Sequence, residues 1–282
     1  MKTPAEVATA GQLACLLEVS APKPGNVSPE HHFHDTRYED FLASALAIGP
    51  ALADAGQQPL GKTVRRAVED TLRWTRSNTN LGIVLLLAPL ARAALSGDGA
   101  LRKRVSRVLA ETTIADAGDV YVAIRRARPG GLGEAAAEDV ALAPTVTLRE
   151  AMGLAAERDS VAREYVTDFG LTFQVGVPAV LAARRVGLPW TDVAVETFLT
   201  LLGNAADTHI ARKLGQSEAS AISRRAREVL AAGGTQSATG RRALAALDSE
   251  LRDPQNRRNP GTTADLTCAA LFVVILEGGW HS

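Results

Sequence analysis

The chain has 282 residues, of which 46% are hydrophobic and only 4% aromatic, and its 31 Lys and Arg side chains equal its 31 Asp and Glu side chains in number. This length and apolar content suit a single globular domain over residues 1–282. The zero net charge provides no overall field that would attract nucleic acid or an anionic membrane, so neither is predicted as a partner.

The cysteines, the N-terminus and the apolar runs predict a cytoplasmic protein. Cys15 and Cys268 lie in apolar stretches without Cys-x-x-Cys spacing, which is typical of core packing in a reducing compartment. Residues Met1–Glu6 reach an acidic side chain before the apolar core of a signal peptide could begin. The longest apolar run, Leu81–Leu95, is shorter than the roughly 20 residues that a bilayer crossing needs. The sequence leaves homo-oligomerisation open.

Helical periodicity runs through almost the whole chain, and the period-2 alternation of strands is absent from the sequence. Apolar side chains recur at helical spacing in several stretches, beginning at Tyr38, Val64 and Leu101. Leu81–Leu95 is predicted as a central buried helix, and two further Ala-rich helices are predicted from Ser217 and from Ser237, each preceded by a capping residue. We therefore expect an all-α, single-domain bundle of roughly ten or more helices, since helices average about 11 to 12 residues.

Three stretches interrupt this helical pattern. The prolines in residues 21–35 forbid a helix and predict an extended path. The Gly-rich residues that begin at Arg128 and the polar residues up to Pro144 are a candidate mobile loop or lid. Residues 253–262 form the third interruption and lead into a last apolar helix, predicted from Leu266 to Leu276.

Polar clusters stand where these apolar stretches end. In Asn259–Leu266 a Gly/Thr-rich turn delivers one carboxylate, Asp265, to the first turn of a buried helix, where the positive helix end favours an anion. Capping alone would also explain Asp265. Because such polar clusters recur at the ends of several apolar helical stretches, we predict that the helix ends form one polar cleft. The other clusters are Gly203–Lys213, Ser20–Asp35, Ser77–Asn80, Asp116–Asp119 and Asp159–Asp168.

Taken in order, these clusters resemble the triphosphoribosyl-dephospho-CoA synthase family over nearly the whole chain. The motifs that carry the resemblance are Ser20–Gly25 followed by a His/Asp cluster, Ser77–Gly82, Gly130–Ala135, Asp207-Thr208 and Pro260–Leu266. The resemblance implies an all-α pentosyltransferase that makes the precursor of a prosthetic group. It implies that the triphosphoribosyl group of ATP moves to a hydroxyl of 3′-dephospho-CoA and that adenine is released.

Two positions depart from the family pattern. The Asn78-Thr79 pair is followed by Asn80-Leu81-Gly82, where the family typically has His-Lys-Gly. Conversely, Asp207-Thr208 continues into His209–Lys213, which adds a histidine and two cations. The chain is thus similar to a divergent branch associated with one-carbon cofactors of the tetrahydromethanopterin type. That similarity implies an alternative reaction, in which a ribosyl phosphate from ATP or phosphoribosyl pyrophosphate is joined to a precursor of such a cofactor.

The predicted chemistry needs carboxylates and a hydrogen-bond donor. Breaking a ribosyl C1′–N9 bond builds an oxocarbenium-like centre, which needs carboxylates near C1′. Asp265 and Asp207 are the candidates, and one of them would deprotonate the acceptor hydroxyl. The leaving adenine also needs a proton or a strong hydrogen bond at a ring nitrogen, for which the candidates are His209, Asn78 and Asn80.

The triphosphate carries about four negative charges, for which Mg²⁺ and cationic side chains are the expected partners. Asp116 and Asp119, three residues apart on a predicted helix, are candidate Mg²⁺ ligands through water. Asp116 could equally cap a helix that begins at Ala117, and Arg163 could form a surface ion pair with Asp159. The residues predicted to bind substrate or phosphate are Lys23, His34, Asn78, Asn80, Arg163, Asp168, Arg212, Lys213, Gly261, Thr262 and Thr263.

Two other classes of function compete with the transferase. His34-Asp35 is the dipeptide of all-α metal phosphohydrolases, which need further histidine ligands, and His209 alone is a candidate. A catalytically silent nucleotide-binding protein would keep the cleft without turnover. Asp207 and Asp265 argue against it, because unpaired carboxylates in an anion-binding cleft are unfavourable unless they act in the reaction. Metal-dependent phosphate release would identify the hydrolase, and tight ATP binding without adenine release would identify the silent binder.

Overall fold

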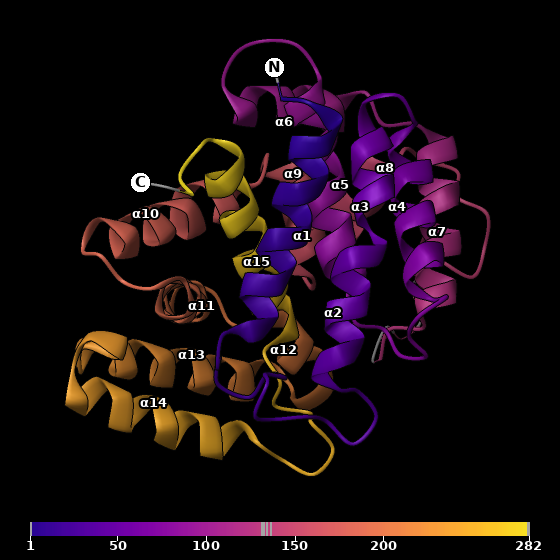
Figure 1. Ribbon diagram of the computed structural model, residues 1–282. Helices are drawn as coiled ribbons and strands as arrows, with labels where there is room; N and C mark the ends of the chain where they lie inside the picture. Colours follow the sequence, from indigo (N-terminus) through magenta and orange to yellow (C-terminus); the bar gives the residue numbers. More distant parts are fainter. Residues whose placement is uncertain (1, 131–132, 134, 136, 281–282) are drawn as a thin grey trace. The chain divides into compact units, whose positions relative to one another are not determined.

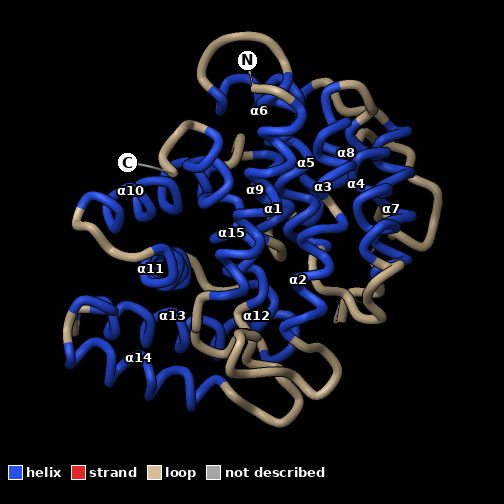
Figure 2. The backbone as a smooth tube through the Cα atoms, in the orientation of Figure 1, coloured by secondary structure: helices blue, strands red, loops and turns tan. Residues whose placement is uncertain are grey.

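The computed structural model describes residues 2–130, 133, 135 and 137–280, and in these residues every regular element is a helix (Figure 1, Figure 2). Outside the helices, these described residues contain one isolated antiparallel β-bridge, between Ser28 and His31. The all-α prediction is confirmed. Over the same described ranges, no helix has both the length and the hydropathy for a membrane crossing. The predicted lid includes residues 131, 132, 134 and 136, which lie outside the described part.

The chain folds into two compact units. The first comprises Met1–Cys15 and Glu39–Gly170, and the second comprises Leu16–Tyr38 and Leu171–Ser282. The predicted polar clusters divide between them: those at residues 77–80, 116–119 and 159–168 belong to the first unit, and those at residues 20–35, 203–213 and 259–265 to the second. A cleft that joins all six clusters stays a prediction.

The first unit is built around a buried central helix. The helix α5 (Leu81–Leu95) has the predicted bounds, and the side chains of Leu86, Leu87 and Leu90 are fully buried. The helices α4 (Leu60–Thr71) and α7 (Ile114–Ala127) pack against each other (Figure 1). The remaining helices are α1 (Pro4–Ser20), whose last residues belong to the second unit, α2 (Tyr38–Ala47), α3 (Gly49–Ala53), η1 (Asp54–Gly56), α6 (Leu101–Ala110), α8 (Leu148–Ala155) and α9 (Ser160–Val166).

The second unit is built around the last helix, α15 (Gly261–Leu276), in which Leu271 and Phe272 are fully buried. A π-helical turn, η2 (Thr172–Gly176), approaches it so closely that a Cβ on Gly176 would stand 2.7 Å from Cβ of Ala270. The other helices are α10 (Val177–Arg185), α11 (Trp190–Asn204), α12 (Thr208–Leu214), α13 (Gln216–Ala231), η3 (Gly234–Gln236) and α14 (Ala238–Leu251).

The helices predicted from Ser217 and Ser237 begin within one residue of those positions, because α13 begins at Gln216, after Gly215, and α14 begins at Ala238. The hydroxyl of Ser237 caps α14 by accepting the N–H of Gly240 at 2.9 Å. The helix α15 begins at Gly261 and not at Leu266. Asp265 therefore lies in the second turn of α15, and the alternative in which it caps the helix is wrong.

The three tryptophans stand in contrasting environments. In the second unit Trp190 stacks on Trp280 with ring centroids 5.0 Å apart, and the guanidinium carbon of Arg184 lies 4.6 Å from the Trp190 ring. This stack attaches the segment after α15 to the start of α11, and the cation over the ring adds to it. In the first unit Trp74, just after α4, is 71% exposed.

Candidate active site

Asp207 connects the first turns of α12 and α15. Its Oδ1 accepts the N–H of Ile210 at 3.0 Å, and its Oδ2 accepts both the N–H and the hydroxyl of Thr263 at 2.8 Å. Asp207 is 2% exposed, and burial raises its pKa although these hydrogen bonds act in the opposite direction. A buried carboxylate with these partners is placed to hold two helices together. The structure thus corrects the prediction that Asp207 takes the proton of a substrate hydroxyl.

The same contacts occupy the N-terminus of α15. The positive end of this helix already faces a carboxylate, that of Asp207. Thr263 gives both its N–H and its hydroxyl to Asp207, and the hydroxyl of Thr262 accepts that of Thr208 at 3.2 Å. Both threonines are buried. The predicted phosphate contacts of Thr262 and Thr263 are therefore corrected: both side chains bind α12.

Gly261 and Asp265 lie on one face of α15, and His209 of α12 lies beside Gly261. Gly261 and Asp265 are four residues apart on the helix and thus project from the same side. Two ring carbons of His209 lie 3.7 and 3.8 Å from the point at which a Cβ of Gly261 would stand. Both His209 and Asp265 are partly exposed, whereas Asp207 behind them is buried. The structure thus places His209 beside Gly261, one helical turn before Asp265 on α15.

The imidazole of His209 is neutral at pH 7. Burial lowers its pKa to about 3, and the charges of Lys213 and Arg212 act in the same direction. Nη2 of Arg212 lies 3.5 Å from Nδ1 of His209. Because a guanidinium only donates, this contact assigns the acceptor role to Nδ1 and the proton to Nε2. His209 therefore offers an N–H donor and not an acidic cation.

Cationic groups border this face of α15. Arg212 and Lys213 form the last turn of α12. Burial lowers the pKa of Lys213, and the negative charges of Asp253 and Asp35 act against that shift. His34 belongs to the same loop as Asp35. The two segments that carry these carboxylates meet where Nδ2 of Asn256 lies 3.2 Å from Nδ1 of His34.

We call this region of the second unit the α12–α15 site and define it by His34, His209, Arg212, Lys213, Gly261 and Asp265. Asn259, to which the sequence pattern assigns no role, stands at its edge. Nδ2 of Asn259 lies 3.7 Å from the Cβ point of Gly261, at a distance like that of the His209 ring. The position directly before Pro260 is the signal in the sequence that could have drawn attention to it.

Lys23 does not bind phosphate in the predicted way, because its ammonium is used inside the second unit. The side chain is fully buried. Its Nζ lies 2.9 Å from Oε1 of Glu18 and also donates to the carbonyls of Glu18 and Ala21. Glu18 neutralises the lysine where α1 ends, and removal of either charge would leave the other buried without a partner. The phosphate contact predicted for Lys23 is wrong.

In the first unit Asn78 and Asn80 organise the start of α5. Oδ1 of Asn78 accepts the N–H of Leu81 at 3.1 Å, and Nδ2 of Asn80 donates to the hydroxyl of Thr71 at 3.0 Å. Asn80 is buried. One end of each amide therefore has a structural partner, and a contact of either residue with adenine stays a prediction.

Asp116 is a structural residue of α7 and not a metal ligand. Thr113 caps the helix and forms a capping box with Asp116, whose Oδ2 accepts the N–H of Thr113 at 2.9 Å. Oδ1 of Asp116 accepts the N–H of Gly61 at 2.8 Å and so ties α7 to α4. The helix begins at Ile114, so the prediction that Asp116 caps a helix from Ala117 is also corrected.

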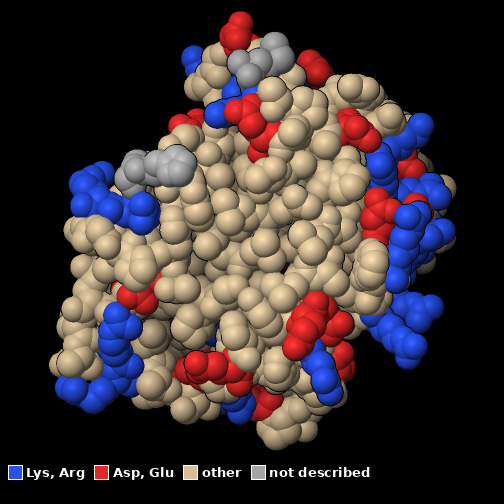
Figure 3. Space-filling view, viewed as in Figure 1, with Lys and Arg blue, Asp and Glu red and all other residues tan. Residues whose placement is uncertain are grey.

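Asp119 belongs to a group of ion pairs between α4 and α7. Its Oδ1 lies 3.1 Å from Nη1 of Arg65, and Oε1 of Glu69 lies 2.9 Å from Arg65 and 3.3 Å from Arg126. Figure 3 shows Lys and Arg side chains interspersed with Asp and Glu side chains on the side of the molecule where Figure 1 places α4 and α7. Across the described ranges no group of three or more His, Cys, Asp or Glu side chains could hold a metal ion. Asp116 and Asp119, the pair predicted to bind Mg²⁺, thus use their carboxylates in hydrogen bonds and an ion pair within the first unit.

Asp168 ends α9 in a left-handed conformation, with φ +52°. The next residue, Phe169, donates its N–H to the carbonyl of Glu164 at 2.9 Å, which is the hydrogen bond of a Schellman end. Glycine usually occupies this position, because a side chain is strained there. An aspartate at the end of α9 therefore needs contacts that favour its side chain.

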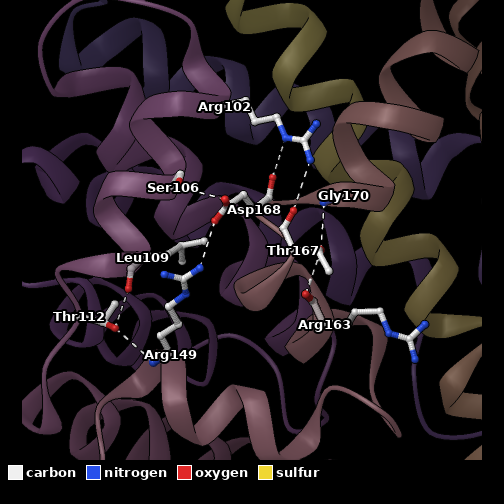
Figure 4. A network of polar contacts seen from close by, with 9 residues as sticks. All are labelled: Arg102, Ser106, Leu109, Thr112, Arg149, Arg163, Thr167, Asp168 and Gly170. Carbon is white, nitrogen blue, oxygen red and sulfur yellow. Dashed lines mark hydrogen bonds and ion pairs between the residues drawn. The ribbon is translucent and has the colours of Figure 1, made fainter.

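The network in Figure 4 supplies those contacts. Oδ2 of Asp168 accepts the hydroxyl of Ser106 at 3.0 Å, Oδ1 lies 3.5 Å from Nη2 of Arg149, and Arg102 donates to the Asp168 carbonyl at 3.0 Å. Arg163 turns back to the carbonyl of Ala156 at 3.0 Å. Asp168 and Arg163 thus have structural contacts in the first unit, and the substrate contacts predicted for them stay predictions.

Comparison with known proteins gives a consistent result over nearly the whole chain. Residues 4–282 match the model of the family described as ATP:dephospho-CoA triphosphoribosyl transferase. A Pseudomonas aeruginosa (strain UCBPP-PA14) protein, a probable 2-(5″-triphosphoribosyl)-3′-dephosphocoenzyme-A synthase, is 30% identical over 255 residues, which are 84% of this chain and 79% of that protein.

Two further comparisons are informative. A Stutzerimonas stutzeri (strain A1501) protein with the same name is 34% identical over 105 residues, and the match spans only 37% of this chain and 36% of that protein. A crystal structure from Archaeoglobus fulgidus, of a protein provisionally named a triphosphoribosyl-dephospho-CoA synthase, is similar with a TM-score of 0.65 and 28% identity. The match covers 84% of this chain and 99% of that one.

Proposed function

Because the chain belongs to the ATP:dephospho-CoA triphosphoribosyl transferase family, we propose that it transfers the triphosphoribosyl group of ATP to a hydroxyl of 3′-dephospho-CoA and releases adenine. The observation that carries this proposal within the structure is the α12–α15 site. It combines a partly exposed carboxylate, Asp265, with the neutral imidazole of His209 and two cations in one unit. Charge separation at a ribosyl carbon requires groups of these kinds.

Asp265 is the carboxylate that we assign to the reacting centre. It would stabilise the positive charge that develops at C1′ as the C1′–N9 bond breaks, and take up the proton of the acceptor hydroxyl. The carboxylate of Asp265 is partly exposed, so it suits this role better than the buried carboxylate of Asp207. Asp207 instead acts as a positioning residue, since its hydrogen bonds to Ile210 and Thr263 set the spacing between α12 and α15.

Arg212, Lys213 and His34 are the groups that we assign to the triphosphate. Two cations at the end of α12 would neutralise part of its charge, and charge-assisted hydrogen bonds to phosphate are the strong ones. We propose that Mg²⁺ arrives bound to the nucleotide, as is usual for this ion. The pair Asp116 and Asp119 does not suit it, because their oxygens bind Thr113, Gly61 and Arg65.

We also propose that the protein works in the cytoplasm. Cys15 and Cys268 are buried and are not joined in a disulfide, which suits a reducing compartment. ATP and dephospho-CoA are metabolites of that compartment. The catalytically silent binder and the transfer to a pterin-type cofactor precursor are the readings against which this proposal is tested.

The test is adenine release, followed by chromatography from ATP and Mg²⁺ with and without 3′-dephospho-CoA. We expect adenine to appear in step with a conjugate of triphosphoribose and dephospho-CoA, and only when both substrates and Mg²⁺ are present. Release that ignores dephospho-CoA would point to another acceptor alcohol, such as the pterin-type precursor. Intact ATP with a measurable dissociation constant would favour the silent binder and contradict the proposal.

A further inference from the structure

A tight turn in the first proline-containing segment is held by a side chain of α14. The N–H of Asn26 donates to the carbonyl of Lys23 at 3.1 Å, which closes the turn. Its central residues are Pro24 and Gly25, and φ of Gly25 is +73°, the combination found in a type II turn. Gly25 is buried, so its N–H needs an acceptor, and Oδ1 of Asp248 provides one at 2.9 Å. We call this segment the 23–26 turn.

Arg252, at the end of α14, completes the contact with the 23–26 turn. Its Nε lies 2.8 Å from Oδ2 of Asp248, and its Nη2 lies 2.7 Å from Oδ1, so the guanidinium and the carboxylate are paired through both oxygens. Nη2 also donates to the carbonyl of Asn26 at 3.3 Å. Such a two-point pair fixes the orientation of both groups, which a single contact does not. We call the pair Asp248 and Arg252 the α14 clasp.

The 23–26 turn packs directly against the residue that precedes α15. A Cβ on Gly25 would stand 2.8 Å from Cβ of Leu251 and 3.3 Å from Cδ of Pro260, so a larger residue does not fit there without a shift of its neighbours. Pro260 is buried and leads directly into the helix that carries Asp265. Closely packed groups transmit displacements. Movement of the 23–26 turn would therefore displace the first turns of α15.

We propose that Asp248 and Arg252 are positioning residues of the transferase, an inference that rests on the proposed function. The α14 clasp fixes the 23–26 turn against Pro260 and so sets the place of Asp265 in the α12–α15 site. Both side chains of the clasp are about one quarter exposed, at 23% and 25%. An ion pair that reaches solvent adds little to stability, so its main effect is on geometry. Neither residue belongs to the motifs that carry the family resemblance.

The experiment compares Asp248→Ala with Glu250→Ala. Glu250 is the matched control, because it lies on the same helix and also pairs with an arginine, Arg225 of α13, at 3.3 Å. We expect Asp248→Ala to lower kcat for adenine release roughly 10- to 100-fold per folded molecule, since small misplacements of a reacting group have effects of this size. KM for ATP should change less, because the cations assigned to the triphosphate belong to α12. Glu250→Ala should keep the kcat of the wild type.

Two further variants separate positioning from stability. Asp248→Asn keeps a side-chain oxygen that accepts the N–H of Gly25, so it should retain most of the kcat that Asp248→Ala loses. Arg252→Met leaves that acceptor in place but releases the carbonyl of Asn26, so its kcat should lie between the two. A merely structural role would lower the unfolding temperature of the variants and leave kcat per folded molecule unchanged. Thermal unfolding gives the folded fraction of each variant at the assay temperature.

Hydrogen–deuterium exchange tests the link between the clasp and α15 without the reaction. Asp248→Ala should speed exchange in the peptides that cover residues 23–26 and 259–265, and Glu250→Ala should change neither. Unchanged exchange over 259–265, or wild-type kcat in folded Asp248→Ala, would overturn the positioning role while the proposed function stands. If the wild-type protein releases no adenine under any condition, the proposed function fails, and the role of the clasp in turnover fails with it.

Discussion

Asp116 in the first unit and Asp207 in the second have the same structural task in different surroundings. Each is a buried aspartate in the first turn of a helix or just before it, and each also accepts a backbone N–H from a second helix, that of Gly61 or Thr263. Near Asp116 the charges of α4 and α7 neutralise one another through ion pairs such as Arg65–Asp119. Near Asp207 stand His209, with its lowered pKa, and Lys213.

The difference shows where a functional signal lies. A lone aspartate at a helix start is explained in both units by hydrogen bonds to the backbone, whatever the chemistry nearby. What sets the second unit apart is that burial lowers the pKa of the basic groups His209 and Lys213 near its aspartate although both are partly exposed, and such shifts are typical of functional sites. The predictions below test this contrast between the start of α7, where Asp116 has only a structural task, and the start of α12, where Asp207 stands beside the candidate active site.

The largest effect is expected for Asp265→Asn. Loss of the carboxylate should lower kcat for adenine release by about 1,000-fold, within the range found for general acid–base catalysis, while the unfolding temperature stays close to that of the wild type. Chromatography of adenine and a thermal melt measure the two quantities. Glu277→Gln, an exposed carboxylate just after α15, is the matched control and should keep full activity. Near wild-type turnover in Asp265→Asn would remove Asp265 from the mechanism.

Asp207→Ala should act first on stability. It leaves the buried N–H groups of Ile210 and Thr263 without acceptors, so we expect the free energy of unfolding to fall by about 2 to 4 kcal/mol. Urea unfolding measures this loss. The folded fraction should also turn over more slowly, because the spacing of α12 and α15 changes. Full stability combined with complete loss of activity would return Asp207 to a direct catalytic role.

Asp116→Ala is the counterpart in the first unit. Loss of the capping box and of the bond to Gly61 should lower the free energy of unfolding by about 1 to 3 kcal/mol. In contrast to Asp207→Ala, kcat per folded molecule and the Mg²⁺ concentration for half-maximal activity should stay unchanged. Asp119→Asn serves as the comparison within the ion-pair group. A higher Mg²⁺ requirement in either variant would support the metal assignment that the geometry opposes.

The pH dependence of stability should report on His209. Its pKa is lowered from 6.5 to about 3, so between these values the unfolded chain binds a proton that the folded chain does not. Stability therefore falls as the pH falls below 6.5. At pH 5.5 the wild type should have lost about 1.4 kcal/mol more than His209→Gln, relative to pH 8, as measured by urea unfolding at both values. Equal losses in both proteins would show that the imidazole is not buried.

The smallest effect is expected for Asp168→Gly. Glycine relieves the left-handed conformation, whereas the contacts with Ser106 and Arg149 are lost, so the two changes should cancel to within about 1 kcal/mol. Turnover should stay that of the wild type. Arg149→Met, which removes only the ion pair, separates the two contributions in the same unfolding assay. A large loss of kcat in a stable Asp168→Gly protein would make Asp168 a substrate residue after all.

Much of the fold follows from local sequence. The apolar run Leu81–Leu95 is a helix with those bounds, and Ser237 caps α14, because periodicity and capping are interactions between near neighbours. The start of α15 could not be predicted in the same way. Glycine and two threonines are poor helix formers, and they are helical here because Asp207, distant in sequence, holds Thr263.

The site was predictable in its residue types more than in their roles. Lys23 between two prolines is as rigid as expected, but its partner is Glu18, and a sequence pattern does not show that the ammonium is buried. The neutrality of His209 depends on burial and on Lys213 and Arg212 around it, so it belongs to the folded state alone. Asn259 carries no motif, and its place beside Gly261 becomes visible only once α12 and α15 are in position.

The contrast between the tryptophans provides the two units with separate spectroscopic labels. Trp74 alone represents the first unit and, at 71% exposure, should emit at long wavelength in the native protein. The stacked rings of Trp190 and Trp280 represent the second unit and should give an exciton signal in near-ultraviolet circular dichroism. In a Trp74→Phe protein all remaining indole fluorescence comes from the unit that holds the α12–α15 site. Its denaturation and its response to nucleotide can then be followed without interference from the rest of the chain.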